Sequence, residues 1–126
     1  MKYNKLVRDK TPELIAAGGN SVSYRILNED EYKTALEEKL DEEVIEYHDS
    51  NSIYELADIV EVLHAILKAN GHSRLKLFIA RMKKKKLKGG FGRRVFLEDI
   101  KERTVAEPQP ELELEDLDDV NERTDA

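Results

Sequence analysis

Two neighbouring segments with apolar residues at helical spacing most constrain how this chain can fold. In residues 28–50, four apolar side chains recur at i, i+4, i+8 and i+11 and form one stripe along a helix: Leu36, Leu40, Val44 and Tyr47. Asn28 or Asp30 is the expected N-cap, because either side chain can accept a hydrogen bond from the first turn. The polar run that follows predicts the end of this helix.

A second helix is expected directly after this polar run, over residues 53–71. Six apolar residues on it are predicted to face the core: Leu56, Ile59, Val60, Leu63, Ile66 and Leu67. Asn70 and Gly71 are of the residue types that commonly terminate helices. Because the connection is short, the two helices are expected to pack antiparallel through their apolar stripes.

Further elements are predicted before and after this helix pair. Pro12 favours the first turn of a short helix capped by Thr11, which a pair of glycines ends. Residues 72–88 predict a third long helix with a basic end. Residues 21–27 alternate enough to predict a short strand, and residues 93–100 could form a second short strand that pairs with it. We therefore expect an all-α helical bundle with a minor two-stranded β-ribbon.

Composition excludes several kinds of site and location. The chain of 126 residues contains no Cys, so it has neither a disulfide framework nor a thiolate metal site. Its apolar runs are too short to cross a bilayer, and its opening lacks the apolar core of a secretory signal. We therefore expect a cytoplasmic protein without a membrane partner.

Acidic charge is concentrated in the C-terminal segment. The formal net charge of the chain is −6, and residues 105–126 alone carry nine acidic side chains and one arginine. That segment also contains prolines and has no core-building pattern, which is typical of disorder. Residues 1–104 are predicted to form one folded domain, and residues 105–126 an acidic, disordered tail.

Two pairs of carboxylates border the predicted helix interface. Glu43 and Glu46 lie three residues apart beside the first apolar stripe, and Glu55 and Asp58 repeat this spacing on the second helix. Residues three apart are neighbours on a helix, so the side chains of each pair can converge. Four half-buried carboxylates at one interface need a counter-charge, which a hard cation such as Mg²⁺ provides. The alternative interpretation is that both pairs are solvated acidic faces.

Basic residues at both ends of this pattern favour a substrate with several phosphates. Lys5, Arg8 and Lys10 lie near the N-terminus, and a longer basic cluster that includes Lys86 begins in the last turns of the third helix pattern. A solvated helix end explains most of the longer cluster, because cations suit a helix C-terminus. A nucleic-acid partner is not expected, since aromatic residues are sparse there and the acidic tail would compete for the same charges.

The two acidic motifs, taken in order, resemble the signature of the all-α NTP pyrophosphohydrolases, which include MazG-like proteins and phosphoribosyl-ATP pyrophosphohydrolases. That signature is E-E-x-x-E followed by E-x-x-D, and it matches "EEVIE" and "ELAD" here. The opening "KLVRDKTPELI" and the later "KLKGGF" resemble two boxes of a MazG-like subgroup. The resemblance spans about residues 3–98, but only eight residues separate Glu46 from Glu55, fewer than expected for the family.

The resemblance implies Mg²⁺-dependent cleavage between the α- and β-phosphates of a nucleotide, with Mn²⁺ as the alternative ion. It also implies a homo-oligomer, as a dimer or a tetramer. The implied metal ligands are Glu43, Glu46, Glu55 and Asp58. Glu42 and Glu43 are the implied catalytic acids, with Glu42 either supporting the site or activating water. The implied phosphate-binding side chains are Arg8, Lys10, Lys39 and Lys86.

A second hypothesis keeps the fold and the nucleotide affinity but has no turnover. The short spacer between the two acidic motifs and the acidic tail motivate such a binding or regulatory module. The sequence indicates neither the base nor the sugar of the nucleotide. Nucleotide hydrolysis in the presence of Mg²⁺ separates the two hypotheses.

Overall fold

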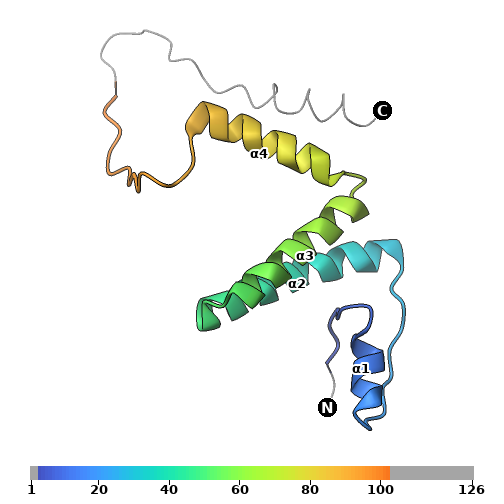
Figure 1. The fold of residues 1–126 in the computed structure, drawn as a ribbon. Helices are drawn as coiled ribbons and strands as arrows, with labels where there is room; N and C mark the ends of the chain where they lie inside the picture. The colour runs from blue at the N-terminus through green and yellow to red at the C-terminus, as the bar shows by residue number, and fades with distance from the viewer. Residues whose placement is uncertain (1–2, 103–126) are drawn as a thin grey trace. The chain divides into compact units, whose positions relative to one another are not determined.

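The computed structural model describes residues 3–102, and all regular secondary structure in that range is α-helical. The helices are α1 (Thr11–Ala17), α2 (Glu29–Ser50), α3 (Ile53–Ala69) and α4 (Arg74–Lys88) (Figure 1). The chain divides into two compact units, Met1–Gly71 with α1 to α3 and His72–Ala126 with α4. The predicted all-α fold is confirmed, whereas the predicted acidic tail, residues 105–126, lies outside the described range. No helix of residues 3–102 has the length and apolarity that crossing a membrane requires.

Helix α1 begins one residue away from the predicted cap. Thr11 is the first helical residue, and Lys10 occupies the N-cap position without a capping hydrogen bond from its side chain. Pro12 lies in the first turn as predicted, where its missing N–H leaves no intrahelical bond unmade. The helix stops at Gly18, and Gly19 has a φ of 93°, which glycine adopts without strain.

Helix α2 begins at a strong capping signal. Asn28 Oδ1 accepts a hydrogen bond from the Glu31 backbone N–H at 2.9 Å, and the Glu31 carboxylate accepts one from the Asn28 backbone N–H at 3.3 Å. This reciprocal pair satisfies two donors near the start of the helix. Of the two predicted caps, Asn28 is therefore the one that the chain uses, and Asp30 lies in the first turn.

A two-residue connection turns the chain from α2 back into α3. Asn51 adopts the left-handed conformation with a φ of 52°, which asparagine tolerates better than most residues, and its N–H donates to the Tyr47 carbonyl at 2.7 Å. Ser52 then caps α3, because its Oγ accepts a hydrogen bond from the Tyr54 N–H at 3.1 Å. Helices α2 and α3 pack side by side (Figure 1).

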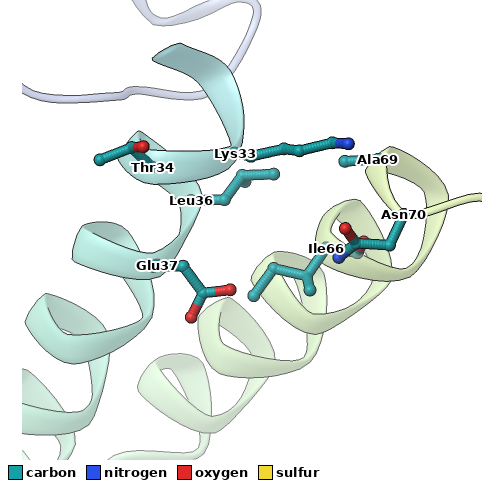
Figure 2. A pocket seen from close by; sticks show the side chains of 7 residues that line it. All are labelled: Lys33, Thr34, Leu36, Glu37, Ile66, Ala69 and Asn70. Carbon is teal, nitrogen blue, oxygen red and sulfur yellow. The ribbon is translucent and has the colours of Figure 1, made fainter. Parts of the chain in front are cut away.

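A pocket of about 180 Å³ at one end of this helix pair shows the direction of packing (Figure 2). Its lining comes from the first turns of α2 and the last turns of α3: Lys33, Thr34, Leu36, Glu37, Ile66, Ala69 and Asn70. The start of α2 therefore meets the end of α3, and the predicted antiparallel arrangement is confirmed.

The packed face of α3 overlaps only in part with the predicted one: Ile59, Ile66 and Leu67 are half-buried, but the other three predicted residues are exposed. Leu36 and Val62 are the buried apolar side chains of residues 3–102. Leu56, Val60 and Leu63 were expected in the core, but their exposed fractions are 39%, 48% and 38%. Because α3 is apolar around most of its circumference, its periodicity does not select the face that is buried.

The packed face of α3 also carries its two acidic motif residues. Val62 follows Glu55 by seven residues and Asp58 by four, so the three side chains share one side of the helix. Ile59 and Ile66, both half-buried, flank the same side. The carboxylates of α3 therefore face the interface with α2 instead of only bordering it.

Helix α4 of the second unit agrees with the predicted third long helix. Ser73 is its N-cap, and its Oγ accepts a hydrogen bond from the Lys76 N–H at 3.1 Å. The helix ends before Gly89, whose φ is 80°. Its last turn is basic, where positive charge interacts favourably with the helix dipole.

The predicted β-ribbon is wrong for the part of the chain that the structure describes. Residues 21–27 and 93–100 contain no strand. Apolar residues of both segments are exposed: Tyr24 and Ile26 of the first are 69% and 85% exposed, and Phe96 of the second is 86% exposed. A two-stranded ribbon without further strands or a covering helix is only marginally stable, so two short segments of this kind are not sufficient to form one.

Candidate metal centre

Three carboxylates from the two packed helices converge on one point. Glu43 of α2 and Glu55 and Asp58 of α3 each offer an oxygen atom, and these three atoms lie within 4.8 Å of one another. Glu43 follows the core residue Leu36 by seven residues, so it points to the same side of α2. Glu43 is only 6% exposed, and the other two acids are half-buried. We call these three residues the acidic triad.

Two oxygens of the acidic triad have no partner. Glu43 Oε2 and Glu55 Oε2 are buried and form no hydrogen bond with the described residues. A buried polar atom left unsatisfied destabilises a fold by on the order of 1–3 kcal/mol. Such atoms are rare in native proteins unless an ion or a water molecule satisfies them. The two oxygens are therefore available to an ion or a water molecule.

The surroundings of Glu43 penalise its ionised form. Burial raises the pKa of Glu43 above the usual 4.5, the hydrogen bond from Lys39 opposes this, and the neighbouring Glu46 carboxylate raises the pKa further. Lys39 Nζ lies 3.3 Å from Glu43 Oε1. A second cation beside Glu43 would lower this pKa and favour the ionised carboxylate.

Glu42 lies beside the acidic triad and is held by two lysines. Its Oε1 accepts a hydrogen bond from Lys5 Nζ at 2.8 Å, and its Oε2 accepts one from Lys39 Nζ at 3.4 Å. These contacts, chiefly the bond from Lys5, lower the pKa of Glu42 below 4.5. A carboxylate engaged through both oxygens is a poor proton acceptor in this arrangement.

Three of the four predicted metal ligands form the acidic triad, and the fourth does not. Glu46 is absent from the group of converging oxygens found among residues 3–102. It follows Glu43 by three residues, so it is turned by about 60° from the Glu43 face of an ideal helix. Glu46 still lies close enough to Glu43 to raise its pKa. Its place is therefore at the border of the site.

The predicted phosphate-binding residues lie in different places. Arg8 Nη2 donates to Asp58 Oδ1 at 2.6 Å, and Lys39 contacts two carboxylates, so both are already bound to acids of the site. Lys10 is exposed just before α1. Lys86 is exposed in the last turn of α4 and belongs to the second unit.

Lys5 is a site residue that the motif did not assign. It lies in the same basic opening as Arg8, but only the folded chain brings it to Glu42 across 37 residues of sequence. The contact raises the pKa of Lys5, mainly through its hydrogen bond with Glu42. The basic opening was the only signal in the sequence that could have suggested this role.

The donor atoms of the acidic triad limit which ions could bind. All three are carboxylate oxygens, which suit hard divalent cations. Thiolate or imidazole ligands, which favour softer metals, are not part of the group. Carboxylates alone do not distinguish Mg²⁺ from Mn²⁺ or Ca²⁺.

Comparisons with known proteins do not assign a family to the chain. No protein-family model matches it, and no solved structure matches it significantly. A curated relative, described as an uncharacterized protein of Mycolicibacterium smegmatis, is 57% identical over 42 residues, which make up 33% of this chain and 43% of that protein. The match thus covers less than half of that relative's length. The resemblance to the all-α NTP pyrophosphohydrolases stays a prediction from the motifs.

Proposed function

We propose that this protein is a Mg²⁺-dependent nucleotide pyrophosphohydrolase that acts in the cytoplasm. Its substrate is a nucleoside triphosphate or a phosphoribosyl-ATP-like nucleotide, and cleavage between the α- and β-phosphates releases pyrophosphate. The main support for this proposal is the convergence of Glu43, Glu55 and Asp58. Glu43 and Glu55 each have a buried oxygen without a hydrogen-bond partner among the described residues. The motif resemblance suggests the reaction, and the charge and geometry of the triad support it.

The residues of the triad fit a divalent cation. Glu43, Glu55 and Asp58 would hold it, because their oxygens already converge and two of these residues have an oxygen without a partner. When bound, such an ion would neutralise phosphate charge and lower the pKa of a coordinated water molecule.

The remaining side chains position the triad and complement phosphate. Lys39 would keep Glu43 in place, because it contacts that carboxylate from one turn earlier on α2. Glu42, the proposed supporting acid, would accept a proton only after Lys5 releases it, since both of its oxygens are engaged. Phosphate binding by Lys10 and Lys86 is proposed from the motifs.

Pyrophosphate release from a panel of NTPs, dNTPs and phosphoribosyl-ATP, with Mg²⁺ or Mn²⁺, tests this proposal. We expect hydrolysis by the wild type and a loss of roughly a hundredfold or more in Glu43→Gln and Asp58→Asn. Glu29→Gln is the matched control, because Glu29 is an 81% exposed acid at the other end of α2. No release from any nucleotide, or equal rates in the triad variants, would contradict the proposal.

A non-catalytic nucleotide-binding or regulatory module of the same fold is the second candidate. The hydrogen bonds from Lys5 and Lys39 to Glu42 favour this alternative, because two lysine ammonium groups make a carboxylate a weaker proton acceptor. Calorimetry that detects nucleotide binding by a chain that does not hydrolyse the same nucleotide would support this alternative.

We also propose that the chain forms a homo-oligomer, a dimer or a tetramer, through the outer face of α3. This face carries an exposed stripe, which we call the α3 stripe: Ile53, Leu56, Val60 and Leu63. Its spacing of three and four residues is that of a coiled-coil seam. A helix that is apolar on both faces is normally buried. A second copy fits the stripe, because its four residues are uncharged and self-pairing brings no like charges together.

A further inference from the structure

Arg8 ties the segment before α1 to the acidic triad. Its guanidinium group donates to Asp58 Oδ1 at 2.6 Å, and 50 residues of sequence separate the two. In the same segment, Lys5 donates to Glu42 at 2.8 Å. The N-terminal segment, residues 3–10, therefore contacts one carboxylate on α3 and one on α2. Both contacts lie within the first compact unit.

Charge around the site is incompletely balanced by these contacts. Five carboxylates face three basic groups, so the cluster carries a formal charge of −2 when all are ionised: Glu42, Glu43, Glu46, Glu55 and Asp58 against Lys5, Arg8 and Lys39. A single divalent cation would balance this charge. Arg8, however, already contacts Asp58, one of the three acids that would bind such a cation. Two cations beside one carboxylate repel each other, so they compete for it.

Arg8 is the basic group of the site that is best suited to leave. Its side chain is 59% exposed, it lies outside any helix, and the contact with Asp58 is a surface ion pair of a kind that contributes little to stability. Lys39 differs, because it is only 17% exposed, projects from α2 and contacts two carboxylates. A guanidinium group also has five N–H donors in a planar fork that matches phosphate.

We propose that Arg8 is an exchangeable counter-ion, which holds Asp58 in the metal-free site and moves to a phosphate group of the substrate when a divalent cation binds the acidic triad. The inference rests on the metal site of the proposed function. It assigns Arg8 two successive anionic partners. Arg8 thereby couples occupation of the metal site to the binding of phosphate.

Calorimetric titration of the full chain with Mn²⁺ alone, without nucleotide, tests the first half of the exchange. Arg8→Gln removes the competitor, so it should bind Mn²⁺ about fivefold more tightly than the wild type, within the range that one surface ion pair can contribute. Arg25→Gln is the matched control, because Arg25 forms an exposed ion pair with Glu31 that involves no residue of the site. It removes the same charge and should leave the affinity unchanged. Circular dichroism confirms that both variants keep their helices.

Titration with inorganic pyrophosphate in saturating Mg²⁺ tests the second half. Arg8→Gln should lose at least about fivefold in affinity for pyrophosphate, whereas Arg25→Gln should match the wild type. If Mn²⁺ binds equally to the wild type and to Arg8→Gln, the metal site stands and the exchange alone is overturned. If the wild type binds no Mn²⁺, the proposed function fails and the exchange fails with it. If Arg8→Gln binds Mn²⁺ more tightly than the wild type but binds pyrophosphate equally well, the transfer of Arg8 to phosphate is overturned.

Discussion

Lys39 Nζ lies 3.3 Å from Glu43 Oε1, and the two residues are one turn apart on α2. Their side chains are only 17% and 7% exposed, so solvent screens this ion pair weakly. Removing one partner of such a pair leaves the other charge uncompensated, which is more unfavourable than the loss of a surface contact. Lys39 therefore supports the acidic triad in the absence of a metal ion.

Lys39→Met should destabilise the metal-free protein by on the order of 1–3 kcal/mol, because Glu43 would lose its contacting cation. Lys33→Met is the matched control on the same helix, since Lys33 forms only an exposed pair with Glu29 at 3.9 Å. Its effect should stay below about 0.5 kcal/mol. Urea unfolding in EDTA measures both. The loss of unfolding free energy in Lys39→Met should become smaller when Mg²⁺ is added. If Lys39→Met and Lys33→Met have equal effects, Lys39 does not have this role.

The pH dependence of stability should show the raised pKa of Glu43. A carboxylate whose pKa is higher in the folded state contributes stability below its unfolded pKa of 4.5, and this contribution is lost as the pH rises through the folded value. Glu42 acts in the opposite sense, because its lowered pKa contributes stability above 4.5 that is lost as the pH falls.

Glu43→Gln isolates the first of these effects, because glutamine does not titrate. In EDTA, the free energy of unfolding of the wild type should fall relative to that of Glu43→Gln as the pH rises from 4.5 toward neutrality. Unfolding curves of both proteins across this interval provide the measurement. A constant difference between them would show that burial does not raise the pKa of Glu43.

Asn28→Ala should destabilise the first unit by about 1 kcal/mol, because it removes the side-chain half of the capping box at the start of α2. Thermal unfolding followed by circular dichroism measures the effect. Asn20→Ala is the control, since Asn20 is exposed and lies outside the helices. If the two substitutions shift the unfolding temperature equally, the cap does not stabilise α2.

Val60→Asp should convert the proposed oligomer into a monomer of 14.5 kDa, because it places a charge in the middle of the α3 stripe. Val60 is 48% exposed within one chain, so the helix pair itself should still form. Light scattering coupled to size-exclusion chromatography measures the mass. Ile26→Asp, at an 85% exposed position outside the helices, should keep the wild-type mass. A monomeric wild type would contradict the proposed oligomer.

Local patterns predicted the helices well, because the information for each lies within a few residues. Asn28 and Glu31 occupy the spacing of a capping box, and Asn70 and Gly71 end α3 as predicted. The alternating residues 21–27 were misinterpreted as a strand, because a strand needs a partner and a covered face that local alternation does not guarantee.

By itself the sequence determined the four helices, the end of α3 at Asn70, and the spacing that makes Glu55 and Asp58 neighbours on α3. Only the tertiary structure decided which side of α3 packs on α2, because apolar residues surround that helix and several faces could be buried. That choice buried Val62, brought the carboxylates of α3 to Glu43, and left Val60 exposed. It also placed Arg8 on Asp58, since a contact across 50 residues depends on how the chain folds back and not on local spacing.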